Sequence, residues 1–159
     1  MATSKIIVPC AEIKAMSEKG ISFLINEEGL RLKPYLDSVH IPTIGIGNTF
    51  YENGIRVTMK DKAITKERAK SLFRTVLHAY EKAVWSNTVD TINQNQFDAL
   101  TSLCYNIGIQ SFKGSTVLRR VNVNQNDVLI IKAFEMWKFA GDKPVLLARR
   151  KREAELYFS

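Results

Sequence analysis

The helical spacing of apolar residues that runs through most of this chain is lost once, between Arg31 and Met59. Residues 43–47, Thr-Ile-Gly-Ile-Gly, alternate with period two, which is typical of a strand. Asp37-Ser38 and Glu52-Asn53-Gly54 are typical of turns. The stretch is divided by Pro34, Pro42, Gly45, Gly47 and Gly54. The sequence therefore predicts a small β-lobe inserted into a helical protein.

Helical patterns flank this stretch on both sides. Ser17 can cap a helix that runs to about Glu28, and a long helix with one buried stripe begins after Thr65. Asn93 and Gln96 form a capping-box pattern for a helix that Gly108 ends. Shorter helices are predicted near Ser115–Val121, Asp127–Phe139 and Leu146–Tyr157. The layout is α+β and mostly helical, in the order helix, small sheet, long helix and helical bundle.

The length of 159 residues suits one domain, which can be divided into two lobes. Residues 1–16 have little pattern and are predicted to be an N-terminal extension. Residues 17–159 are predicted to form the domain. Within it, the β-lobe spans about 31–62 and the helical lobe about 65–159.

The chain is strongly basic, with a formal net charge of +7 at pH 7. This favours an anionic partner, such as nucleic acid, an acidic membrane surface or an acidic wall polymer. No apolar run approaches the roughly 18 residues that span a membrane, so we expect no membrane insertion. Cys10 and Cys104 are too few for a disulfide scaffold, and we expect both to be free thiols.

One carboxyl group continues an apolar helix stripe. Ile21, Leu24, Ile25 and Glu28 fall at i, i+3, i+4 and i+7, so Glu28 is expected to point inward at the end of its helix, before Gly29. Partial desolvation and the negative end of the helix dipole would both raise the pKa of Glu28. A carboxylic acid in that state can donate a proton near neutral pH.

Two further residues follow Glu28 at fixed spacing, in the pattern Glu-x8-Asp-x5-Thr. Asp37 lies in a turn, where solvent and hydrogen-bond donors are expected to keep its pKa low. Thr43 shares a strand face with Gly45 and Gly47 in the predicted alternation, so its hydroxyl is expected to have no bulky neighbours. Two carboxyls with diverging pKa values beside a cleft suit the cleavage of a glycosidic bond.

These residues resemble the signature of the phage-type lysozymes, glycoside hydrolase family 24, and most of all the endolysins of lambdoid phages. The resemblance runs from about Ser17 to Ser159. It also rests on 93–100 (NQNQFDAL), 105–108 (YNIG), 114–119 (GSTVLR), Trp137 and 149–153 (RRKRE). Asn48 stands where the family often has His, and Val145 stands where it often has Gly.

The resemblance implies a two-lobed lysozyme-like fold and a role for each site residue. Glu28 would protonate the glycosidic oxygen. Asp37 would stabilise the transition state or activate water, and Thr43 would help to place that water. The outcome would be inverting. Arg149 or Arg150 would pair with Glu28, and sugar contacts are implied for Thr49, Tyr105 and Ser115.

The resemblance also implies a substrate and a setting. The enzyme would hydrolyse the β-1,4 bond between N-acetylmuramic acid and N-acetylglucosamine in peptidoglycan, without a cofactor, metal or nucleic acid. It would be a monomer made in the host cytoplasm. It would reach the periplasm or cell wall through a membrane lesion made by a separate holin.

Two other classes of function compete with this interpretation. A lytic transglycosylase cleaves the same bond without water and needs only the acid, so Asp37 and Thr43 argue against it. A basic binding module for nucleic acid or wall polymer needs none of the three residues. Neither His40 nor His78 has a suitably spaced Cys, His or Glu partner for a metal site.

Overall fold

A computed structural model of the chain describes residues 13–89 and 91–159. Cys10 and most of the predicted extension, 1–16, lie outside the described residues. The chain divides into two compact units. We call residues 22–78 the β-unit, and residues 13–21 together with 79–159 the helical unit. Helices α1 (Glu18–Glu28) and α2 (Lys66–Asn87) each have residues in both units.

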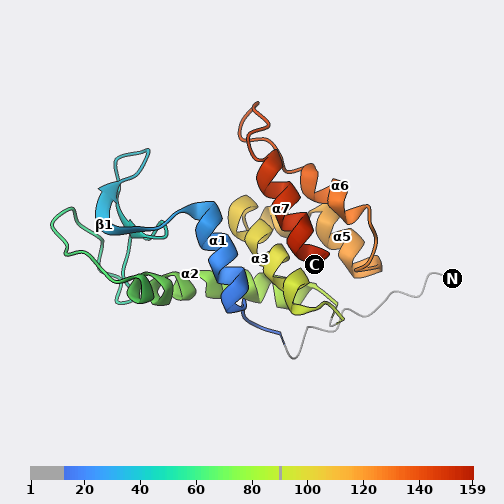
Figure 1. The fold of residues 1–159 in the computed structure, drawn as a ribbon, viewed down its shortest axis with the longest axis horizontal. Coiled ribbons are helices and arrows are strands. Elements are labelled where there is room, and N and C mark those ends of the chain that lie inside the picture. Colours follow the sequence, from blue (N-terminus) through green and yellow to red (C-terminus); the bar gives the residue numbers. More distant parts are fainter. Residues whose placement is uncertain (1–12, 90) are drawn as a thin grey trace. The chain divides into compact units, whose positions relative to one another are not determined.

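The β-unit contains a two-stranded antiparallel sheet formed by β1 (Arg31–Leu36) and β2 (Pro42–Gly45) (Figure 1). Tyr35 pairs with Thr43, and Arg31 pairs with Gly45. Four steps along β1 therefore match two steps along β2, which makes a bulge in β1. Pro34 lies within this bulge, where a residue that has no N–H for the ladder is tolerated.

The core of the β-unit lies between β2, the loop that follows it and the first half of α2. Ile44, Val57 and Leu72 are buried there, and Tyr51 and Ile64 pack against them. The Tyr51 hydroxyl donates to Asp61 over 2.8 Å. Burial and the neighbouring carboxylate raise the pKa of Tyr51 to about 12. The long loop between β2 and α2 is thus fixed by both packing and hydrogen bonds.

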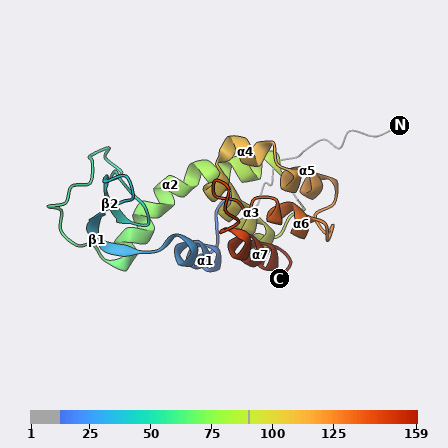
Figure 2. The same cartoon turned by 90° about the horizontal axis from the view of Figure 1, so that it is seen from above.

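The helical unit is arranged around α3 (Gln94–Ile107), which is buried over most of its length. α3 packs against α7 (Leu147–Tyr157), and α7 also packs against α6 (Ile130–Glu135) (Figure 2). Two more short helices, α4 (Ile109–Lys113) and α5 (Thr116–Val123), lie between α3 and α6 in the chain. The Asn93–Gln96 capping box begins α3, and Gly108, with φ 91°, ends it.

A buried carboxylate fixes the first turn of α1 in the helical unit. Asp98 of α3 is 0% exposed and accepts hydrogen bonds from the Ser17 N–H (3.1 Å) and the Ser17 hydroxyl (2.5 Å). Gly20 makes this approach possible, because a Cβ atom there would lie 2.4 Å from the Asp98 Cγ. Burial raises the pKa of Asp98, an effect that its hydrogen bonds to Ser17 and Gln94 oppose.

The structure confirms the predicted fold class and most of the helices, but two elements were missed and two expectations were wrong. Strand β1 and helix α4 were not predicted, and α6 is shorter than the predicted Asp127–Phe139. Val76, which the pattern placed on the buried stripe of α2, is 39% exposed. Cys104 is a buried free thiol, as predicted, and burial raises its pKa to about 12.

Candidate active site

Asp37 is the first residue of the turn that joins β1 to β2. Its Oδ1 accepts hydrogen bonds from the N–H groups of Val39 and Ile41, each over 2.9 Å. Its backbone carbonyl accepts from the His40 N–H, and His40 has a positive φ of 63°. Asp37 is therefore both the turn former that the sequence predicts and a half-buried carboxylate held in one orientation.

Thr43 is linked to Asp37 through the Ile41 peptide. The Ile41 carbonyl accepts from the Thr43 hydroxyl (2.9 Å) and from the Asp37 N–H (3.1 Å), and the Ile41 N–H donates to Asp37 Oδ1. The structure thus brings two of the three predicted catalytic residues together on one hairpin. The five residues between them, 38–42, contain the turn and the first residue of β2.

The predicted surroundings of Thr43 were wrong in two respects. Gly47 does not extend the strand, because β2 ends at Gly45 and the chain turns back through an Ile44–Asn48 bridge. Thr43 also has a bulky neighbour, since Tyr35 lies directly opposite it in the ladder. Thr43 is only 2% exposed. The alternation showed where β2 begins but could not reveal its unpredicted partner strand.

The expected burial of Glu28 was also wrong. The stripe formed by Ile21, Leu24 and Ile25 is buried, but Glu28 is exposed. Glu28 is the last residue of α1, and Gly29, with φ 85°, turns the chain toward β1. The partial desolvation predicted for this carboxyl requires burial, and the Glu28 side chain is exposed.

The two arginines that the sequence assigned to Glu28 lie on α7 in the helical unit. Arg149 and Arg150 are 7% and 0% exposed. The Arg149 Nε donates to Glu153 Oε1 over 3.1 Å, and the Arg150 Nη2 donates to Asn106 Oδ1 over 2.5 Å. The Arg150 Nε lies 3.3 Å from Glu153 Oε2. The pairing of either arginine with Glu28 stays a prediction.

Residues that hold these arginines were missed by the sequence analysis. Glu153 is fully buried and also accepts from the Ser102 hydroxyl of α3 over 2.7 Å. Burial raises the pKa of Glu153, while Arg150 and Arg149 oppose that effect. The signal was present in the spacing of Arg149, Arg150 and Glu153, which places all three on one side of a helix.

The three residues with implied sugar contacts have structural partners. Ser115 is 4% exposed and caps α5 by accepting from the Leu118 N–H over 3.1 Å. The Tyr105 ring packs edge-on against Tyr80, with centroids 5.1 Å apart. Thr49 is half-buried, and its carbonyl accepts from the Val57 N–H. Their contacts with sugar stay predictions.

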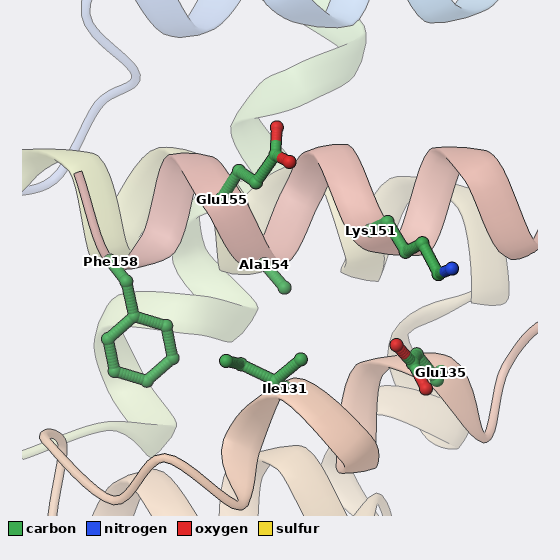
Figure 3. Close-up of a pocket in the computed structure, with 6 residues that line it drawn as sticks. All are labelled: Ile131, Glu135, Lys151, Ala154, Glu155 and Phe158. Carbon is green, nitrogen blue, oxygen red and sulfur yellow. The ribbon is translucent and has the colours of Figure 1, made fainter.

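A pocket between α6 and α7 contains none of the predicted site residues. Figure 3 shows Ile131 of α6 pointing toward α7, beneath Ala154. The pocket is lined by Ile131, Glu135, Lys151, Ala154, Glu155 and Phe158. Within residues 13–89 and 91–159 there is no cluster of three or more His, Cys, Asp or Glu side chains that could hold a metal ion.

The fold, a small antiparallel sheet before a long helix and a helical bundle, is of the lysozyme type. The chain belongs to the phage lysozyme family, whose model ("Phage lysozyme") matches residues 25–155. It is 46% identical over 145 residues to the endolysin of Salmonella phage P22, with 91% of this chain and 98% of that protein covered.

Solved structures agree with this assignment. The chain is similar to a crystal structure of a P22 lysozyme mutant, with a TM-score of 0.85 and 44% identity over 92% of this chain and 100% of that one. It is similar to the endolysin from Escherichia coli O157:H7 phage FAHEc1, with a TM-score of 0.80 and 35% identity over 90% and 92% of the two chains. The protein is therefore a lysozyme, a glycoside hydrolase that acts on peptidoglycan.

Proposed function

We propose that Glu28 is the general acid of this lysozyme and that Asp37 and Thr43 handle the attacking water. The observation that carries the proposal is the Ile41 link, which joins the Asp37 carboxylate to the Thr43 hydroxyl on the hairpin that follows Glu28. Only two residues, Gly29 and Leu30, separate Glu28 from β1. All three residues therefore belong to the β-unit.

Asp37 supports this division of work through its two oxygens. Oδ1 accepts hydrogen bonds from the N–H groups of Val39 and Ile41. Oδ2 accepts no hydrogen bond from any residue in the described part of the chain, so it is available to a water or a sugar. A carboxylate with one oxygen anchored and one available can orient a water for attack on the anomeric carbon.

Thr43 supplies an oxygen in a defined orientation. Its hydroxyl hydrogen is directed at the Ile41 carbonyl, so its remaining lone pairs can accept a hydrogen bond from a water. An inverting reaction needs such a water on the opposite face of the sugar from the acid. It also needs carboxyl groups roughly 6.5–9.5 Å apart. We infer an inverting mechanism, in which Glu28 protonates the leaving oxygen.

We further propose that the protein is an endolysin that lyses the host late in infection. Its net charge of +7 favours binding to the anionic wall. In the described part of the chain, no helix has both the length and the apolar character that a membrane crossing requires. Accumulation in the host cytoplasm as a monomer, release through a separate holin and action in the periplasm or wall complete the proposal.

Mass spectrometry of soluble fragments from purified peptidoglycan tests the chemistry. Attack by water predicts fragments that end in a hydrated, reducing N-acetylmuramic acid. Fragments 18 mass units lighter, with 1,6-anhydro ends, would show a transglycosylase and remove the proposed roles of Asp37 and Thr43. Absence of any fragments would instead favour a binding module. Heat-inactivated protein is the control.

A further inference from the structure

The catalytic hairpin carries a tyrosine with no assigned role. Tyr35 is the ladder partner of Thr43, and cross-strand partners project from the same side of a sheet. Tyr35 also precedes Asp37 by two positions, and Asp37 begins the turn directly after β1. The phenol ring therefore lies on the same side of the sheet as Thr43, two residues before Asp37 in the chain.

The Tyr35 hydroxyl is available to a ligand. The side chain is half-buried, and its hydroxyl makes no hydrogen bond to any residue within 13–89 or 91–159. Across most of this structure, buried tyrosine and threonine hydroxyls have partners, as Tyr157 does with the Gln125 carbonyl at 2.8 Å. An accessible phenol with no protein partner is suited to exchange hydrogen bonds with sugar hydroxyl groups.

Arg31 holds the ring of Tyr35 in place. Its guanidinium carbon lies 4.6 Å from the ring centroid, the distance of a cation–π contact. The bulge in β1 makes this contact possible, because it places Arg31 and Tyr35 opposite Gly45 and Thr43, which are only two residues apart. The guanidinium on one face of the ring favours the ring orientation seen in this structure.

We propose that Tyr35 is a substrate-binding residue whose hydroxyl hydrogen-bonds the glycan next to the bond that is cleaved. Arg31 is a positioning residue that acts through the Tyr35 ring. The proposal rests on the proposed function, because it places the sugar beside Asp37 and Thr43. By this proposal, the β1–β2 hairpin binds the glycan through Tyr35 and also carries Asp37 and Thr43.

The chain offers a matched control in the same unit. The guanidinium of Arg56 lies 4.8 Å from the centroid of the Phe50 ring. This second contact has nearly the same distance between guanidinium and ring, but its ring has no hydroxyl group. If a cation–π stack only stabilises a hairpin, removing either arginine will change stability and leave substrate binding unchanged.

The test measures kcat and KM on soluble glycan chains, together with Tm. Tyr35→Phe keeps the ring and loses one neutral hydrogen bond, so we expect kcat/KM to fall about 3- to 10-fold, mainly through KM, with Tm unchanged. Arg31→Gln is expected to raise KM, and Arg31→Lys not to restore it, because an ammonium group cannot stack as a plane does. Arg56→Gln is expected to leave KM unchanged.

Three results would overturn the proposal. A wild-type kcat/KM for Tyr35→Phe would show that the Tyr35 hydroxyl does not bind the glycan. Full rescue by Arg31→Lys would show that a planar guanidinium stacked on the ring is not needed. An equal rise in KM for Arg56→Gln would show that both arginines affect KM only by stabilising the structure. Each result leaves the proposed function standing as long as Glu28→Gln remains inactive.

Discussion

Glu28→Gln is expected to abolish clearing of outer-membrane-permeabilised cells. Glutamine has nearly the same shape as glutamic acid but cannot donate a proton to the leaving oxygen. Loss of a general acid typically costs about 10²- to 10⁴-fold in rate. Glu28 is exposed at the end of α1, where an amide of nearly the same size fits without a clash in a packed core. The measurement is the initial rate of turbidity loss.

The neighbouring glutamate provides the control. Glu27→Gln changes the same charge one residue earlier on α1 and should retain most of the activity. Circular dichroism of both variants should show the same helical content as the wild type. Clearing by Glu28→Gln at the wild-type rate would show that the acid has been assigned to the wrong residue.

Glu153→Ala is expected to lower the free energy of unfolding more than any other substitution proposed for this protein. The carboxylate accepts from Ser102 and Arg149 and lies beside Arg150, and all of these groups belong to the helical unit. Removing it takes the Glu153 acceptor from the buried Arg149 guanidinium and the neighbouring negative charge from the buried Arg150 guanidinium. Breaking a buried ion pair from one side typically costs about 3–5 kcal/mol. For a chain of this size, that corresponds to a fall in Tm of roughly 6–20 °C.

Urea unfolding followed by circular dichroism measures the effect on the free energy of unfolding. Glu155→Ala is the matched control, because Glu155 lies two residues further along α7 and is exposed. Its change should stay within about 0.5 kcal/mol. A loss below about 1 kcal/mol for Glu153→Ala would contradict the view that this carboxylate holds the two arginines.

The helices could be predicted because their apolar stripes and caps are local signals. Asn93 and Gln96 begin α3 as expected, and Gly108 ends it. Strand β1 could not be found in the same way, because its burial does not alternate and Pro34 interrupts it. Its conformation depends on pairing with β2, which is a tertiary interaction. The predicted limits of the extension and the two lobes stay predictions.

Spacing predicted the site better than burial did. The turn at Asp37 and the strand at Thr43 follow from residue types within a few positions, and the Ile41 link joins them as a consequence. The predicted burial of Glu28 was wrong. An apolar stripe indicates the direction in which a side chain points, but not whether another element packs against the end of that helix face. Tyr35 opposite Thr43 depends on the bulge, which no periodicity reveals.

Proton NMR of the product at early times tests the central claim most directly. The claim is that Glu28 protonates the leaving oxygen while Asp37 and Thr43 direct water to the opposite face of the sugar. It predicts that the new reducing end of N-acetylmuramic acid appears first as the α-anomer and then mutarotates. Initial formation of the β-anomer would require attack with retention of configuration and would contradict the account.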